Sequence, residues 1–359
     1  MSASGLHVDD DGKGNLKDNP DPVVWSTHDE PQVIDWLWKG MIVRGGLQLL
    51  AGEPEQGKST ILCDLAARIT AGAAWPDGQA GGPPARVIIM SKEDDYHSVW
   101  LPRFMVAGGD KNLLGHIPVD HPFRIDRPTD QEWLQHHMTR NTPKVAATMI
   151  DPLDDFTNAN LDSSKAKAVR GALITSHVLA THHRSAVLAI KHLNKASGED
   201  GRTPLQRLEG SAAYGAVPRN VLAVALNKDG RTFFGPLKGS LRAKAGRTVL
   251  EYDFETVPHP ISADPEDAIS RILWKEECDV SLRKLMEEPA VVVKAVRPAP
   301  ELEKALAFWR QVLGDGQQHP IRPVRDLAKE KGITEPTLDR ARGLLGVRSE
   351  RGYYSLAAR

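Results

Sequence analysis

Short apolar runs alternate with stretches of helical periodicity through the first 250 residues of the chain. The run at 47–51 precedes a segment over 61–69 in which apolar side chains recur at helical spacing. A longer helical stretch is expected over 165–181. Further apolar runs of strand length are found at 87–90, 145–150, 186–190 and 221–226. Strands alternating with helices predict an α/β domain with a mostly parallel sheet.

The pattern divides the chain of 359 residues into four segments. Residues 1–30 carry seven acidic and two basic side chains with little apolar periodicity, which predicts a disordered acidic tail. The α/β domain is expected over 31–258, closing with short strands. Helical spacing followed by proline-rich sequence predicts a helical segment and linker over 259–300. A separate small domain is expected over 301–359.

The C-terminal segment has the pattern helix, helix, glycine-containing turn, helix and β-ribbon. This order is similar to that of a winged helix-turn-helix domain. The third helix would be the recognition helix and would carry Thr337, Arg340 and Arg342. Eleven basic and eight acidic side chains over 301–359 are compatible with DNA, but such folds also bind proteins, so both partners stay open.

The composition favours a cytoplasmic globular protein. Hydrophobic residues make up 40% and charged residues 26% of the chain. No apolar run has the length needed to cross a bilayer, and the N-terminus lacks a signal-peptide pattern, so no membrane partner is expected. Cys63 and Cys278 lie far apart in sequence and are expected to be free thiols, and no Cys/His cluster has zinc spacing.

The clearest chemistry lies between the first apolar run and the helix that follows it. Gly52, Gly57, Lys58 and Ser59 match the G-x-x-x-x-G-K-[ST] pattern of a phosphate-binding loop, which alone predicts binding of ATP or GTP. Lys58 would contact the β- and γ-phosphates and Ser59 would ligate Mg²⁺. Glu55 places a carboxylate inside the loop and is expected to point away from the phosphates. The candidate nucleotide-binding residues are Gly52, Glu53, Pro54, Glu55, Gln56, Gly57, Lys58, Ser59 and Thr60.

Three polar side chains follow other predicted strands, at the edge where open α/β sheets bind ligands. Glu93 follows the strand at 87–90 and would orient or deprotonate the attacking water. Asp151 follows the strand at 145–150 and would complete the Mg²⁺ shell with Ser59. His192 follows the strand at 186–190 and would sense the γ-phosphate. The alternatives are a solvated acidic turn for Glu93 and a structural histidine for His192.

Basic residues predict two further contacts. Lys195, Arg202 and Arg207 lie in a long polar loop and would give it a basic face for a DNA backbone. Arg219 precedes the strand at 221–226, so it is expected at the edge opposite the phosphate loop. From that edge it would contact the nucleotide of a neighbouring subunit.

Five motifs taken in order resemble the RepA-type branch of the RecA-like hexameric ATPases, the replicative helicases of plasmids and phages. The resemblance covers roughly residues 36–252. Its motifs are Leu-Leu-Ala-Gly-Glu-Pro-Glu-Gln-Gly-Lys-Ser-Thr (49–60), Met-Ser-Lys-Glu-Asp-Asp (90–95), Met-Ile-Asp-Pro-Leu (149–153), Lys-His-Leu-Asn-Lys (191–195) and the segment 210–219. Glu55 departs from the family, which usually has glycine there, and His192 lacks a second adjacent histidine.

The resemblance implies a RecA-like core and an ATPase that uses ATP and Mg²⁺. Lys58, Glu93, Asp151 and His192 would act within one subunit, and Arg219 would act in trans, so hydrolysis would require a homo-oligomeric ring, a hexamer in this family. Single-stranded DNA is the expected substrate, and a replication initiator or primase the expected protein partner. The alternative is an ATP-controlled DNA-binding regulator or replication accessory protein that does not translocate.

Overall fold

The computed structural model describes residues 30–140, 142–157, 166–194, 203–208, 212–239, 241, 248–287, 300–314, 317–345, 347–350 and 352–356. The chain forms two compact units. The first comprises Met1–Val224 and Phe234–Leu282, and the second comprises Ala225–Phe233 and Arg283–Arg359. The first unit therefore extends past residue 258, where the predicted α/β domain ends.

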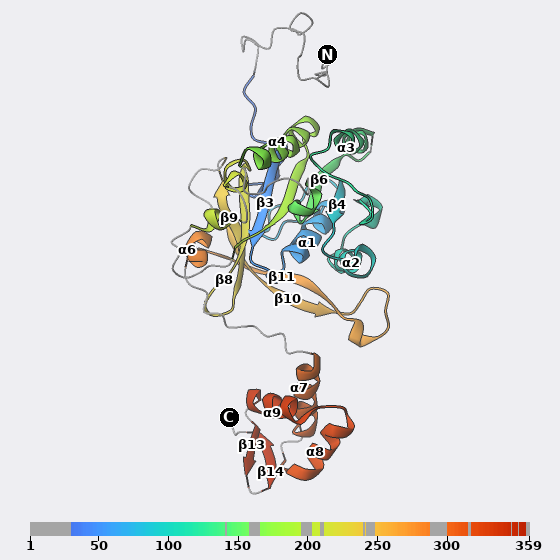
Figure 1. Ribbon diagram of the computed structural model, residues 1–359, viewed down its shortest axis with the longest axis vertical. Coiled ribbons are helices and arrows are strands. Elements are labelled where there is room, and N and C mark those ends of the chain that lie inside the picture. The colour runs from blue at the N-terminus through green and yellow to red at the C-terminus, as the bar shows by residue number, and fades with distance from the viewer. Residues whose placement is uncertain are drawn as a thin grey trace, which may run out of the picture. The chain divides into compact units, whose positions relative to one another are not determined.

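A large, mostly parallel sheet forms the centre of the first unit (Figure 1). Among the described residues its order is β11-β10-β9-β8-β3-β7-β6-β4-β5. The strands from β8 to β5 in this order pair in parallel, which confirms the predicted α/β class. The strands are β3 (Gly46–Gly52), β4 (Arg86–Ser91), β5 (Leu114–His116), β6 (Val145–Asp151), β7 (Ala186–His192), β8 (Asn220–Leu226), β9 (Thr232–Gly239), β10 (Val249–Val257) and β11 (Ile269–Cys278).

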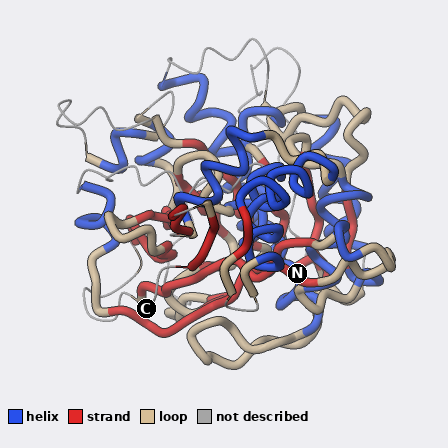
Figure 2. Tube along the Cα trace, turned by 90° about the horizontal axis from the view of Figure 1, so that it is seen from below, coloured by secondary structure: helices blue, strands red, loops and turns tan. Residues whose placement is uncertain are grey.

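Helices connect the parallel strands (Figure 1), and Figure 2 shows the chain coloured by secondary structure. Helix α1 contacts β3, β4 and β6, and α4 contacts β3 and β7. A small hairpin, β1 (Trp36–Trp38) with β2 (Ile42–Val43), precedes β3. The helices are α1 (Lys58–Ala71), α2 (Leu101–Val106), α3 (Pro128–Arg140), α4 (Ala166–His183), α5 (Ala213–Ala216) and α6 (Leu282–Glu287). None of the described helices is long and apolar enough to cross a membrane.

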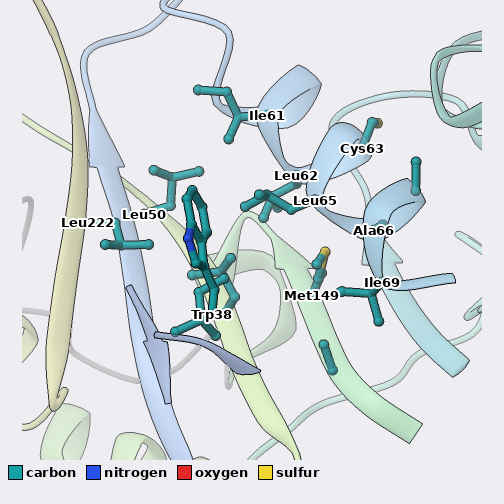
Figure 3. Close-up of a cluster of buried hydrophobic side chains, with 14 of the residues drawn as sticks. Trp38, Leu50, Ile61, Leu62, Cys63, Leu65, Ala66, Ile69, Met149 and Leu222 are labelled. Carbon is teal, nitrogen blue, oxygen red and sulfur yellow. The ribbon is translucent and has the colours of Figure 1, made fainter. Parts of the chain in front are cut away.

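The apolar face of α1 fixes this helix on the sheet. Ile61, Leu62 and Leu65 are at most 1% exposed and face Leu50 of β3 and the Trp38 indole (Figure 3). Burying a side chain of this size stabilises the fold by about 1.5–3 kcal/mol. Helix α1 therefore begins at a fixed position beyond the end of β3, where the glycine-rich loop joins them.

The strand register brings several strand ends to one level. Gly52 at the end of β3 is opposite His192 at the end of β7, and Ser91 at the end of β4 is opposite Asp151 at the end of β6. The carboxyl ends of parallel strands share one edge of a sheet. The loop after β3 and the polar residues that end the other strands therefore meet at this edge.

The predicted helix within 259–300 is wrong over its first half. Ile269–Cys278 forms strand β11, which pairs antiparallel with β10. Ile272 is 6% exposed, the next residue Leu273 is 45% exposed, and Trp274 donates through Nε1 to Asp64 of α1 at 2.8 Å. The apolar positions fit both helical spacing and strand alternation, and pairing with β10 selects the strand.

The second unit contains three helices and a small sheet in the region 300–356. Its order is α7, β12, α8, α9, β13 and β14, and the sheet order is β12-β14-β13. Trp309 and Tyr354 are its largest buried side chains, with ring centroids 4.8 Å apart. The bounds are α7 (Pro300–Val312), β12 (His319–Pro320), α8 (Ile321–Glu330), α9 (Glu335–Leu344), β13 (Val347–Glu350) and β14 (Tyr353–Leu356).

Two residues of the loop before α1 have left-handed backbone conformations. Gly57 has φ 78° and Glu55 has φ 64°. A glycine adopts this region freely, whereas a side chain there costs roughly 1–2 kcal/mol. The Glu55 side chain is exposed. The departure at Glu55 therefore has a backbone cost, because this position suits glycine.

We expect Glu55→Gly to stabilise the chain. Relief of the left-handed strain, less the greater flexibility of glycine in the unfolded state, leaves about 0.5–1 kcal/mol. The measurement is urea unfolding of the full chain. Glu55→Gln keeps the Cβ that strains this backbone conformation and removes only the charge. The urea concentration at its unfolding midpoint should therefore equal that of the wild type. An equal shift in both variants would assign the effect to charge instead of backbone.

Candidate active site

The loop between β3 and α1 has the hydrogen bonds of a closed phosphate-binding turn. The backbone N–H of Glu53 donates to Gln56 Oε1 at 3.0 Å, and Lys58 Nζ donates to the Glu53 carbonyl at 2.7 Å. The Ile61 N–H donates to the Gly57 carbonyl, so helix α1 starts directly after Gly57. Helix N-termini present unpaired backbone N–H groups and attract anions. The loop can therefore surround a phosphate chain.

The remaining residues of the loop divide into buried and exposed positions. Thr60 is buried and Ser59 half-buried at the first turn of α1, whereas Pro54 is exposed. Gly52 has no room for a side chain, because an added Cβ would lie 2.2 Å from Val224 Cγ2 and 3.3 Å from Lys58 Cδ. The glycine at this position therefore lets the Lys58 side chain pass close to the strand end.

Lys58 is a buried cation surrounded by carboxylates. It is 5% exposed. Burial lowers the pKa of its ammonium group, while the charges of Glu93, Asp151 and Glu53 raise it again. The convergence of these groups on one ammonium places the ends of β4 and β6 beside the loop.

Asp151 is the most constrained acid of the site. It is 1% exposed, its carboxylate oxygens make no hydrogen bond of good geometry among the described residues, and the Ser59 hydroxyl lies close enough to act on them. Burial raises the pKa of Asp151 to about 7, the Ser59 hydroxyl and the Lys58 ammonium oppose this rise, and Glu93 adds to it. A buried carboxylate without donors is costly unless a cation or donor satisfies it. Asp151 and Ser59 thus suit a divalent cation.

Glu93 and His192 lie next to each other at the ends of β4 and β7. His192 Nε2 is 3.9 Å from Glu93 Oε2, and the Glu93 side chain is 50% exposed. His192 Nδ1 is buried and has no partner among the described residues. A water molecule could therefore reach Glu93 from solvent, with an imidazole beside it.

Arg219 lies at the opposite edge of the sheet. Its backbone N–H donates to the Leu47 carbonyl at the start of β3, at 3.2 Å. The register of β8, with Asn220 opposite Gln48, places Arg219 before the strand begins. The residue is exposed.

The residues predicted to contact nucleic acid are differently placed. Lys195 and Arg202 lie outside the described residues. Arg207 is 5% exposed, forms an ion pair with Glu53 of the phosphate loop, and donates through Nε to the Asn194 carbonyl at 3.1 Å. Its charge is therefore directed at the loop and not at a solvent-exposed face.

In the second unit, helix α9 carries the three predicted contact residues. The Thr337 hydroxyl is 2.9 Å from that of Thr334. Arg342 Nε is 3.6 Å from Asp339 Oδ1, and its guanidinium lies 5.9 Å from the centre of the Tyr354 ring. Arg340 is on the same helix, and its side chain is outside the described part of the structure.

Three residues near the site make contacts that their place in the sequence does not reveal, although Ser91 and Lys191 lie within two of the motifs. Tyr252 of β10 donates through its hydroxyl to the Gln56 carbonyl at 2.6 Å. Buried Ser91, opposite Asp151, has a hydroxyl with no partner among the described residues. Lys191 Nζ is 2.6 Å from Asp154 Oδ2, and Lys191 is 1% exposed. Each depends on pairing between distant segments, although Ser91 and Lys191 do adjoin predicted strand-end positions.

The described residues contain no group of three His, Cys, Asp or Glu side chains that could hold a metal ion.

Comparison with solved structures found a chain titled "ATPase Domain of G40P". The two share 13% sequence identity, and the alignment covers 58% of this chain and 81% of that chain with a TM-score of 0.44. No curated protein matched the sequence.

A family model described as "AAA domain" (AAA_25) matches residues 15–198, slightly more than half of the chain. The matched region contains Lys58, Glu93, Asp151 and His192 and ends before Arg219. The chain belongs to the AAA domain family of ATPases.

Proposed function

We propose that this chain is a Mg²⁺-dependent ATPase of the RepA-like hexameric helicase type. It couples ATP hydrolysis to movement on, or remodelling of, single-stranded DNA in the replication of a plasmid or phage. The observation that carries the proposal is the convergence of Lys58, Asp151, Glu93 and His192 on the phosphate loop, with Arg219 exposed at the opposite edge.

Binding begins with the phosphate loop. The backbone N–H groups at the start of α1 and the Lys58 ammonium hold the phosphate chain of ATP. Lys58 donates to the Glu53 carbonyl at 2.7 Å. This contact holds the ammonium beside the loop that would surround the phosphates.

Ser59 and Asp151 would hold the Mg²⁺ ion. The buried Asp151 carboxylate beside the Ser59 hydroxyl is the feature that fits a cation. When bound, Mg²⁺ neutralises charge that develops on the β- and γ-phosphates.

Glu93 prepares the water for attack. Its half-exposed carboxylate accepts a hydrogen bond from a water molecule and orients it, or takes its proton. His192, 3.9 Å away, responds to the state of Glu93 and of the γ-phosphate. Its position at the end of β7 lets it transmit that state to the loop that follows.

Arg219 acts on a neighbouring copy. It lies level with Leu47, and Gly52 at the loop is five residue steps further along β3. At about 3.3 Å per residue this is roughly 16 Å, more than an arginine side chain spans. Arg219 therefore stabilises transition-state charge in an adjacent subunit, which requires assembly into a homo-oligomeric ring, a hexamer by family resemblance.

The second unit supports DNA binding or docking of a protein partner. Its three helices and three-stranded sheet have the element order of a winged helix, with α9 as the recognition helix. This observation favours a second candidate function, an ATP-controlled regulator that binds duplex DNA without translocation. A replication initiator or primase would be the protein partner, in the cytoplasm, in either case.

We expect hydrolysis to be stimulated by single-stranded DNA and to be lost in Lys58→Ala. Without its ammonium the site cannot neutralise the phosphates, so hydrolysis and strand unwinding disappear together. The measurement is phosphate release with and without single-stranded DNA, beside an unwinding assay. Lys111→Ala, at an exposed lysine of the same unit, is the matched control. Hydrolysis indifferent to single-stranded DNA, combined with duplex binding, would favour the regulator.

We expect Arg219→Ala to bind ATP normally and to lose about 10³-fold or more in kcat, as removal of an arginine finger does. Mixing it with Lys58→Ala subunits should restore part of the turnover. The intact sites of the first variant then receive Arg219 from the second. Activity near that of the wild type in Arg219→Ala alone would remove this residue from the reaction.

We expect Asp151 to make the nucleotide-free chain less stable as the pH rises. The pKa of Asp151 is about 7 in the folded chain and about 3.9 in the unfolded chain. Its contribution to the free energy of unfolding is therefore fully present below about pH 4 and is lost as the pH rises from there through 7. Asp151→Asn should remove this loss and be more stable than the wild type at pH 8, by a few kcal/mol in order of magnitude.

The measurement is urea unfolding from pH 4 to pH 8 without nucleotide or metal. Asp155→Asn, at an exposed acid on the same turn, should follow the wild-type profile. If the free energy of unfolding changes with pH in the same way for the wild type and Asp151→Asn, ionisation of Asp151 does not destabilise the fold and the prediction is wrong.

A further inference from the structure

The turn between α5 and β8 is held by one lysine from β9. Lys238 Nζ donates to the carbonyl oxygens of Gly215 at 2.8 Å, Ala216 at 3.0 Å and Pro218 at 3.0 Å. An ammonium group has three protons, and all three are used here. Lys238 therefore serves the backbone of this turn.

The peptide group that leads into Arg219 is fixed on both sides. Its carbonyl, from Pro218, accepts from Lys238, and its N–H, from Arg219, donates to the Leu47 carbonyl of β3 at 3.2 Å. The Arg219 backbone is thus attached to the sheet at two points. Burial lowers the pKa of Lys238, and the positive charge of Arg219 lowers it further. The two cations therefore lie near each other at this turn.

The other end of α5 is attached to the carboxyl edge of the sheet, where β3, β4, β6 and β7 end, and which is called the nucleotide edge below. The Tyr214 hydroxyl donates to Asp154 Oδ1 at 3.1 Å, and Asp154 Oδ2 lies 2.6 Å from Lys191 Nζ. The Lys191 ammonium lies 4.3 Å from the centre of the Tyr214 ring. Asp154 follows Asp151 by three residues, and Lys191 directly precedes His192.

We propose that Lys238 and Tyr214 are positioning residues for Arg219. Lys238 holds the peptide group before Arg219, and Tyr214 attaches the same turn to Asp154 and Lys191 at the chain's own nucleotide site. The position of Arg219 at a neighbour's site then depends on the nucleotide edge of its own subunit. This inference rests on the proposed trans role of Arg219.

The first test is Lys238→Met, which keeps the side-chain length and removes the donors. ATP binding and KM should stay near wild-type values while kcat falls about 10- to 100-fold, the effect of misplacing a reacting group. Mixing with Lys58→Ala subunits should restore turnover, because those subunits supply a correctly held Arg219. Mixing with Arg219→Ala subunits should not. Lys111→Met is the matched control.

The second test is Tyr214→Phe, which keeps the ring over Lys191 and removes the hydroxyl. A smaller fall in kcat is expected, with the same pattern of rescue. Tyr353→Phe, in the second unit, is its control. If Lys238→Met fails to bind ATP, Tyr214→Phe decides alone: wild-type kcat overturns the inference.

The two proposals fail in distinguishable ways. Wild-type activity in Arg219→Ala overturns the trans role of Arg219 and with it the positioning role of Lys238 and Tyr214, whereas ATP hydrolysis that responds to single-stranded DNA is decided by the Lys58→Ala experiment. If Arg219→Ala is inactive and is rescued by Lys58→Ala, the trans role stands. Wild-type kcat in Lys238→Met, or rescue of Lys238→Met by Arg219→Ala instead of Lys58→Ala, would then overturn the positioning role.

Discussion

The burial of the Asp151 carboxylate, opposed only in part by the Ser59 hydroxyl and the Lys58 ammonium, is the constraint on which the rest of the site depends. A charge in this position costs free energy in the absence of a ligand, which is why the pKa of Asp151 is raised to about 7. Lys58 and Ser59 reduce that cost only in part. The register that places β3, β4, β6 and β7 level maintains this arrangement, and the apolar face of α1 keeps the loop over it. The buried carboxylate thus destabilises the chain at the position where binding of a cation and an anionic nucleotide would offset the cost.

The fold class and the groups at the nucleotide edge were predictable because each depends on local sequence. The apolar run at 145–150 determines where Asp151 emerges, and the loop motif determines Lys58 and Ser59. A parallel sheet then brings strand ends together whatever the details of the loops. Glu93 and His192 follow the same rule, and the structure places them 3.9 Å apart. The left-handed backbone at Glu55 was not visible in the sequence, since only coordinates reveal a φ value.

Features that depend on pairing between distant segments were not predictable. Strand β11 shares its apolar spacing with a helix, and only β10 selects between them. Arg207 lies in a loop whose composition is basic, but its guanidinium forms an ion pair with Glu53, which is far away in the sequence. Lys238 lies in no motif, and Tyr214 lies in the segment 210–219 without a pattern that would reveal its contact to Asp154. Their partners are backbone carbonyls and a carboxylate whose positions follow from how β9, α5 and β6 are assembled.

The two edges of the parallel sheet carry different chemical groups. The carboxyl edge carries the phosphate loop and the acids, whereas the amino edge carries Arg219, separated from the loop by the length of β3. No side-chain movement closes a gap of that size. In the proposed trans role, the Arg219 of one copy completes the site of a neighbour. The contacts from Asp154 through Tyr214 to the Lys238 turn connect the two edges within one copy, so the proposed position of Arg219 depends on the carboxyl edge of its own subunit.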